Sequence, residues 1–126
     1  MFIRLEVLPA TLLLLTDEMK FDHRLIMGDF NIAMKHELDT SGYLHVNNPN
    51  TREFLTRQTN LSNLVDIWRI RNPNSRQFTF QKKQARNYTR ARLDYFLVSE
   101  NSSEYIKNVL IGRMCSLFDH QPIHLS

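Results

Sequence analysis

Three short segments of the sequence carry side chains that could together activate a water molecule beside a divalent metal ion. They are Gly28-Asp29-Phe30-Asn31, Arg92-Leu93-Asp94-Tyr95 and Asp119-His120. Carboxylates are common Mg²⁺ ligands, and a carboxylate beside a histidine fixes the tautomer of the imidazole. If the three segments meet in the fold, one site receives two carboxylates, an amide and an imidazole.

Asp29 and Asn31 follow an apolar stretch that predicts a short strand over Arg24–Asp29. If the chain stays extended, the two side chains share one face of that strand, and Phe30 points the other way. The same letters are equally typical of a polar turn, in which Asp29 and Asn31 bond to the local backbone. The pattern leaves both interpretations open.

Asp94 lies inside an apolar run, Leu93–Val98, that predicts a strand. A buried carboxylate is costly unless it is paired or hydrogen-bonded, so a partner is expected, and a histidine would suit. The alternative is a surface-facing acid paired with Arg92 or Arg90. Asp119 and His120 precede a strand start at Pro122, and adjacent residues on an extended segment point to opposite sides. One of the two can therefore face a metal ion while the other turns away.

Two further features are consistent with a nucleic-acid partner, each with a plainer explanation. Trp68 could stack on a base, although a lone tryptophan more often packs in a core. The basic segment could contact phosphates, although a solvated basic loop is the default. Its cations, with Tyr88 among them, are Lys82, Lys83, Arg86, Arg90 and Arg92.

The elements that must position these residues alternate in type. Helices are predicted from Pro9 to about Lys20 and over residues 51–60, with loop over 33–49 and a turn over 72–75. Strands are predicted over 24–29, 77–81, 89–99, 104–111 and 122–125, and residues 82–87 form a hairpin loop between two of them. This order predicts one mixed α/β domain over residues 1–126.

Composition narrows the functional classes. The net charge of +3 permits a polyanionic partner without requiring one. The single cysteine, Cys115, excludes a disulfide within the chain and a thiolate metal cluster, and it favours a reducing, intracellular compartment. The longest apolar run, Leu12–Leu15, is far too short to span a membrane.

The order of the motifs resembles the endonuclease/exonuclease/phosphatase superfamily, most closely the apurinic-endonuclease-like nuclease domains of LINE-type non-LTR retrotransposons. The motifs are Gly-Asp-Phe-Asn, Trp-Arg before an Asn-Pro turn, Phe-Thr-Phe, Arg-Leu-Asp-Tyr-Phe-Leu-Val-Ser and Asp-His-x-Pro-Ile. They extend over residues 24–125. The resemblance implies a DNase-like fold, which is a four-layered α/β sandwich of two similar sheets.

The resemblance also implies roles for individual residues. Asp29 orients or deprotonates the attacking water, Asn31 helps to hold the phosphate, Asp94 supports the catalytic His120, and Asp119 lies near the metal with Asp29. The reaction is Mg²⁺-assisted hydrolysis of a DNA phosphodiester, with Mn²⁺ as an alternative ion. No small-molecule cofactor and no membrane partner are implied.

The sequence departs from the family pattern in two ways. Phe118 stands where the family has a serine before Asp-His. No asparagine precedes Asp29, although the first half of the family fold supplies an asparagine and a glutamate to the metal; Glu6 and Glu18 lack the expected strand context. We therefore expect the C-terminal half of the fold, with an apolar sheet face available for association.

Three functions remain open at this point. The first is a retroelement-type endonuclease, truncated and of undetermined activity. The second is an inactive remnant or weak nucleic-acid-binding module. The third is a phosphatase or phosphodiesterase of the same superfamily that acts on lipid or inositol head groups.

Overall fold

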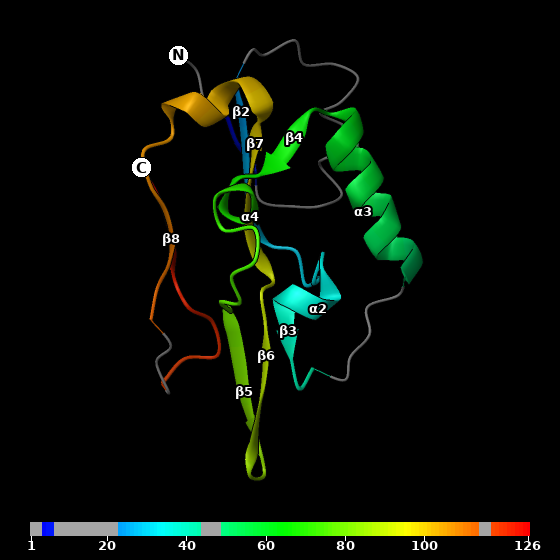
Figure 1. Ribbon diagram of the computed structural model, residues 1–126, viewed down its shortest axis with the longest axis vertical. Helices are drawn as coiled ribbons and strands as arrows, with labels where there is room; N and C mark the ends of the chain where they lie inside the picture. The colour runs from blue at the N-terminus through cyan, green and yellow to red at the C-terminus, as the bar shows by residue number, and fades with distance from the viewer. Residues whose placement is uncertain (1–3, 7–22, 44–48, 114–116) are drawn as a thin grey trace.

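The computed structural model describes residues 4–6, 23–43, 49–113 and 117–126 of the chain (Figure 1). Its helices are α2 (His36–Asp39), α3 (Pro49–Leu61), α4 (Ile67–Arg71) and the 3₁₀ helix η1 (Glu100–Tyr105). Its strands are β1 (Arg4–Glu6), β2 (Arg24–Asp29), β3 (Thr40–Ser41), β4 (Leu64–Asp66), β5 (Phe80–Gln84), β6 (Asn87–Ala91), β7 (Asp94–Ser99), β8 (Val109–Ile111) and β9 (Ile123–Leu125).

A four-stranded sheet in the order β1-β2-β7-β4 forms the centre of the molecule. The two central strands, β2 and β7, run antiparallel, while β1 is parallel to β2. Residues 95–99 of β7 are all buried, which is why this strand has a continuous apolar sequence instead of an alternating one. Strand β7 is therefore covered on both faces.

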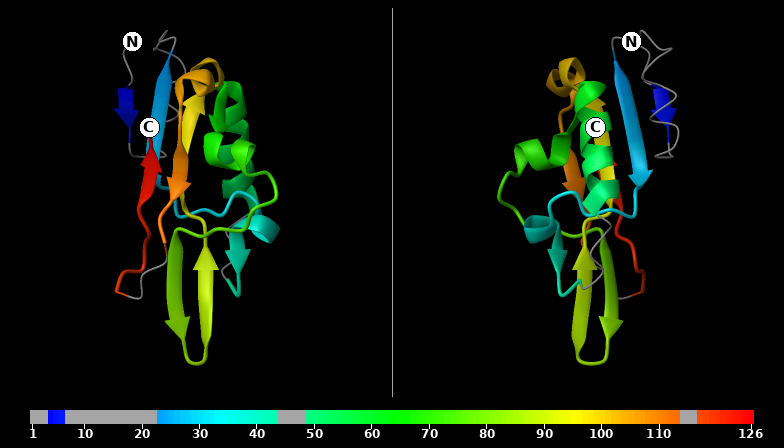
Figure 2. Two further views of the ribbon diagram at one scale, coloured as in Figure 1. Left: turned by 60° about the vertical axis from the view of Figure 1, so that its left-hand side comes forward. Right: turned by 90° about the vertical axis from the view of Figure 1, so that its right-hand side faces the viewer.

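Helix α3 covers one face of the sheet, and α4 lies with the β8–β9 pair on the other (Figure 2). The core on the α3 side consists of Ile26, Phe30, Ile32, Leu55, Leu64, Tyr95 and Leu97. The core on the other side consists of Leu25, Ile67, Trp68, Phe96, Val98 and Val109. The neighbouring residues of β2 and β7 alternate between these two cores, as the pleat of a strand requires.

A second sheet, in the order β3-β6-β5, continues from the end of the first. Strands β5 and β6 form a hairpin that extends away from the central sheet (Figure 1). Its turn is only two residues long, Ala85 and Arg86, and Ala85 has a φ of 51°. Two-residue hairpin turns require positive φ, which an alanine rarely adopts.

Several expected elements are confirmed. The strand predicted over 24–29 is β2, with the same bounds, and the helix predicted over 51–60 lies within α3. The last predicted strand, 122–125, contains β9. The helix expected over residues 9–20 lies outside the described residues. Among the described residues, no helix is long and apolar enough to cross a membrane.

Five expectations were wrong in part. The loop over 33–49 contains α2 and β3, and the hairpin loop over 82–87 is strand except at its two-residue turn, because cross-strand pairing overrides the low strand propensity of charged residues. The strand over 77–81 begins only at Phe80 and extends to Gln84. The strand predicted over 89–99 is interrupted at residues 92–93. The strand predicted over 104–111 begins only at Val109, after η1 and a connecting segment.

Candidate active site

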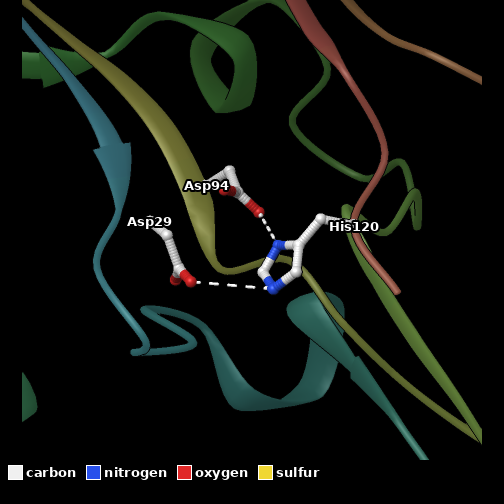
Figure 3. A group of neighbouring side chains, drawn as sticks. All are labelled: Asp29, Asp94 and His120. Atoms are coloured by element: carbon white, nitrogen blue, oxygen red, sulfur yellow. Dashed lines mark hydrogen bonds and ion pairs between the residues drawn. The ribbon is translucent and has the colours of Figure 1, made fainter. Parts of the chain in front are cut away.

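Asp29 and Asp94 face each other at one end of the four-stranded sheet. Asp29 is the last residue of β2 and Asp94 the first of β7, and the two are paired in the antiparallel register. Like charges that are paired directly destabilise a sheet, so this pair needs a compensating group. His120 supplies it, because its imidazole lies between the two carboxylates (Figure 3).

The imidazole contacts the two acids unequally. Nδ1 of His120 lies 2.9 Å from Oδ2 of Asp94, and Nε2 lies 3.6 Å from Oδ2 of Asp29. The first contact is a hydrogen bond from Nδ1–H to the carboxylate, and the second is too long to be one. The side chains are 45% exposed for Asp29, 42% for His120 and 16% for Asp94, so Asp29 and His120 are open to solvent while Asp94 is mostly enclosed.

Asn31 is placed by a tight turn directly after β2. Its φ is 51°, and its backbone N–H donates a 2.8 Å hydrogen bond to Oδ1 of Asp29. The extended geometry that would put both side chains on one strand face is therefore wrong, because the strand ends at Asp29. The local-turn interpretation is confirmed, and the turn also holds the Asp29 carboxylate with its other oxygen toward His120.

Thr79 connects the segment that carries Asp94 to the segment that carries His120. Its hydroxyl, which is fully buried, accepts hydrogen bonds from the backbone N–H groups of Leu93 (2.9 Å) and Asp94 (3.1 Å). Its carbonyl accepts a 2.6 Å bond from the N–H of Gln121. One residue therefore fixes both ends of the Asp94–His120 contact. Only the threonine of the Phe-Thr-Phe motif pointed to this residue, and its role was not predicted.

Aromatic rings form the wall beside His120. The Phe80 ring lies 5.3 Å from the imidazole centroid, and Tyr43 packs edge-on against Phe80 at 6.4 Å. Burial, followed by the negative charge of Asp29, raises the pKa of the Tyr43 phenol above its usual value. Tyr43 is therefore a neutral hydroxyl beside the site at physiological pH. It falls in the stretch that the sequence predicted as loop, so the sequence did not indicate it.

A buried ion network lies behind the site. Nε of Arg92 donates to Oδ1 of Asp39 at 2.7 Å, and Nη2 of Arg92 donates to Oδ2 of Asp66 at 2.6 Å. Arg69 donates to the same Oδ1 of Asp39. Because Arg92 is 1% exposed, its inclusion in the solvated basic segment was wrong, and so was its alternative role as the partner of Asp94. The network fixes the backbone directly before Asp94.

Trp68 is held by the same network. Its ring is 4% exposed, and the guanidinium carbons of Arg69 and Arg92 each lie 4.9 Å from the ring centroid. The expected alternative, core packing instead of base stacking, is confirmed for this tryptophan. The Trp-Arg pair therefore contributes to the scaffold of the site and not to a surface that bases could reach.

The donor set fits a hard divalent cation. Asp29, Asp94 and His120 offer ligand atoms that all lie within 4.8 Å of one another, the one such group among the described residues. Nδ1 of His120 is engaged with Asp94, so the Asp29 carboxylate is the more exposed oxygen donor of the group. Mg²⁺ commonly binds through one or two carboxylates, with waters and substrate phosphates completing its shell. Mn²⁺ accepts the same oxygen ligands.

Asp119 does not belong to this group of ligands. Its carbonyl accepts a 2.7 Å hydrogen bond from the N–H of Gln81, and residue 120 bridges to Phe80. His120 therefore shares a face with Phe80, and the Asp119 side chain next to it is exposed. The role of Asp119 near a metal remains a prediction. Phe118, in the position of the family serine, is also exposed.

Comparison with solved structures identifies the architecture. An AP endonuclease from Archaeoglobus fulgidus superimposes with a TM-score of 0.74 at 19% identity, over 92% of this chain and 50% of that one. The chain has the fold of this AP endonuclease. A 3′-5′ exonuclease from Neisseria meningitidis gives a TM-score of 0.73 at 22% identity, over 93% and 50%. The catalytic domain of Xenopus laevis APE2 gives 0.64 at 20% identity, over 91% and 41%.

The chain spans half or less of the length of these solved structures. No protein-family model matches the sequence, and no curated protein matches it. The expected DNase-like α/β architecture is confirmed, and the described chain corresponds to one part of it. At identities this low, structural likeness establishes the fold alone. The function therefore depends on the chemistry of the site itself.

Proposed function

We propose that this chain carries the Asp29–Asp94–His120 centre of a divalent-metal-dependent phosphodiesterase that hydrolyses DNA. The observation that carries the proposal is the imidazole held between two carboxylates at the end of paired strands. An oriented histidine beside an exposed carboxylate is suited to moving a proton and stabilising charge at a phosphorus centre. The finer assignment, a LINE-type endonuclease domain, rests on the order of the sequence motifs.

The proposed reaction assigns one task to each side chain. Asp29 accepts a proton from water as the water oxygen attacks phosphorus, and the bond from phosphorus to the 3′ oxygen breaks. Nε2–H of the protonated His120 donates to a phosphoryl oxygen, and Asp94 stabilises the imidazolium. The leaving 3′ oxygen takes its proton from solvent. The amide of Asn31 binds a second phosphoryl oxygen.

A bound Mg²⁺ would polarise a phosphoryl oxygen and offset charge on the leaving oxygen. Asp29 would hold the ion, and we propose Asp119 as a further group near it. DNA as the substrate is supported by the similar structures, which include AP endonucleases and a Neisseria 3′ phosphatase bound to a product DNA hairpin.

Nicking of supercoiled plasmid tests this proposal. With Mg²⁺, the chain should convert plasmid to the open circle, and EDTA should stop the conversion. Asp29→Ala should abolish it, while Glu53→Ala on the exposed face of α3 should not change it. Equal rates for the chain and Asp29→Ala would remove the enzymatic proposal.

Two further outcomes distinguish the alternative functions. Release of phosphate or a head group from phosphoinositides or sphingomyelin, without plasmid nicking, would favour the phosphatase alternative. Salt-dependent DNA binding without any cleavage would identify an inactive nucleic-acid-binding module. Both outcomes contradict the proposal that the chain hydrolyses DNA.

A further inference from the structure

One face of the β5–β6 hairpin combines cations with an aromatic ring. Residues 81 and 83 of β5 pair with residues 90 and 88 of β6, and side chains alternate along a strand, so these four share a face. They are Gln81, Lys83, Tyr88 and Arg90. The opposite face carries Phe80, which contacts His120. This surface is therefore distinct from the catalytic one.

The side chains on this face are held in place before any ligand binds. Nε of Arg90 donates a 3.0 Å hydrogen bond to Oε1 of Gln81, and the Arg90 guanidinium lies 5.3 Å from the Tyr88 ring centroid. Tyr88 itself is 41% exposed, so one part of the ring remains accessible. The guanidinium of Arg90 keeps further N–H donors that could bind a phosphate. Because the side chain is already held in place, binding would cost little side-chain entropy.

The same face continues into a pocket lined by three arginines. The pocket has a volume of about 320 Å³, and Arg76, Arg90 and Arg113 line it together with Phe78. Nη2 of Arg76 is anchored on the carbonyl of Thr40 at 2.7 Å. Within the part of the chain that the structure describes, no carboxylate forms an ion pair with these three arginines. Their charge is thus available to an anion.

Two walls of the pocket share backbone with the residues that hold the catalytic groups. Phe78 directly precedes Thr79, whose hydroxyl holds Asp94. The N–H of Gly112 donates a 2.7 Å bond to the carbonyl of Pro122, two residues after His120. A side chain at position 112 would collide with Pro122, since a Cβ there would lie 2.7 Å from its ring. The pocket wall is therefore fixed to the segment that carries His120.

We infer that this face, from Lys83 and Tyr88 through the three-arginine pocket, binds a single strand of nucleic acid. Arginines spaced among aromatic rings suit an alternation of phosphates and bases, and a base can stack on a ring only if it is not paired in a duplex. Phosphates would contact Arg90 and Arg113, and bases would stack on Tyr88 and Phe78. The choice of nucleic acid as the ligand rests on the proposed function. The binding itself does not require that the chain cleaves this ligand.

Fluorescence anisotropy with a labelled 15-nucleotide oligo-dT, in EDTA, measures this binding without catalysis. Tyr88→Ala should weaken binding about fivefold or more, as expected for the loss of one stacked base. Its control is Phe54→Ala, a similarly exposed aromatic residue on α3. Arg113→Gln should reduce the slope of log K against log[salt] by about 0.7, the value for one phosphate on a single strand. Its control, of equal charge change, is Arg57→Gln on α3.

The inference predicts that both controls bind like the unmodified chain and that a duplex of the same length binds more weakly. It is overturned if Tyr88→Ala and Phe54→Ala bind equally well, or if Arg57→Gln lowers the salt slope as much as Arg113→Gln does. Equal affinity for duplex and single strand would also overturn it. Because no metal is present, a chain that fails to nick plasmid can still pass this test.

Discussion

Nδ1 of His120 lies 2.9 Å from Oδ2 of Asp94, although 26 residues separate them in sequence. Asp94 begins a buried strand, and His120 is bridged to the strand that begins at Phe80, so two different sheets meet at this contact. Because Nδ1 donates to the carboxylate, the second ring nitrogen is directed toward Asp29. The contact therefore sets the chemistry available to the site.

We predict that the Thr79 hydroxyl is required to position Asp94. Thr79→Val keeps the side-chain volume but leaves the N–H groups of Leu93 and Asp94 without their acceptor. It should lower the kcat of nicking by roughly 10- to 100-fold, with a smaller effect on KM, because the Asp94–His120 geometry shifts. Thr79→Ser keeps the hydroxyl and should retain most of the activity. Equal kcat values for the valine and serine variants, both measured in the folded state, would exclude this positioning role.

We predict that Asp39 contributes strongly to the free energy of unfolding, because it pairs with the two buried arginines behind the site. Asp39→Ala leaves Arg69 and Arg92 with buried charge that has lost its shared carboxylate. Breaking a buried pair in this way costs about 3–5 kcal/mol of unfolding free energy, which urea denaturation measures. Glu53→Ala breaks only an exposed pair with Arg57 and should cost about 0.5 kcal/mol or less. Similar losses in the two variants would show that the buried network is not stabilising.

Tyr95 should make stability fall at alkaline pH. Burial raises the pKa of its phenol above the usual value, so the folded state keeps a proton that the unfolded state loses above about pH 10. This contribution to stability is complete below pH 10 and should decline by about 1.4 kcal/mol per pH unit above it.

The matched variant for this prediction is Tyr95→Phe. It should be less stable at neutral pH, because the N–H of Met34 loses the hydroxyl that accepts from it. Its unfolding free energy, measured in urea from pH 9 to 11, should decline less steeply than that of the unmodified chain. Parallel declines would contradict the assignment of the alkaline loss to Tyr95.

The sequence predicted those features of the site that follow from the chemistry of neighbouring residues. A carboxylate inside the apolar run of β7 needs a partner, and that requirement correctly anticipated the contact of Asp94 with His120. The bounds of β2 were predictable because an apolar run ends sharply at Gly28-Asp29. Gly28 has a φ of 148°, a conformation that other residues rarely adopt, so its position at the strand end has a backbone cause.

The remaining features depend on contacts between distant segments. Arg92 looks like a solvent-exposed cation in sequence, but Asp39, 53 residues earlier, and Asp66 hold it in the interior. The turn that places Asn31 and the hydrogen bonds of Thr79 likewise depend on backbone geometry that residue patterns do not specify. Long-range pairing of this kind overrides local propensity. The sequence therefore predicted the side chains of the site better than it predicted the scaffold that holds them.

A double-mutant cycle in plasmid nicking tests the central claim most directly. The four proteins are the unmodified chain, Asp94→Asn, His120→Gln and the double variant, assayed with Mg²⁺ under single-turnover conditions. If the two residues act as one unit, each single variant should lose roughly 10²- to 10⁴-fold in rate, and the double variant should lose no more than the worse single variant. Losses that multiply in the double variant, or single variants as active as the unmodified chain, would contradict the account.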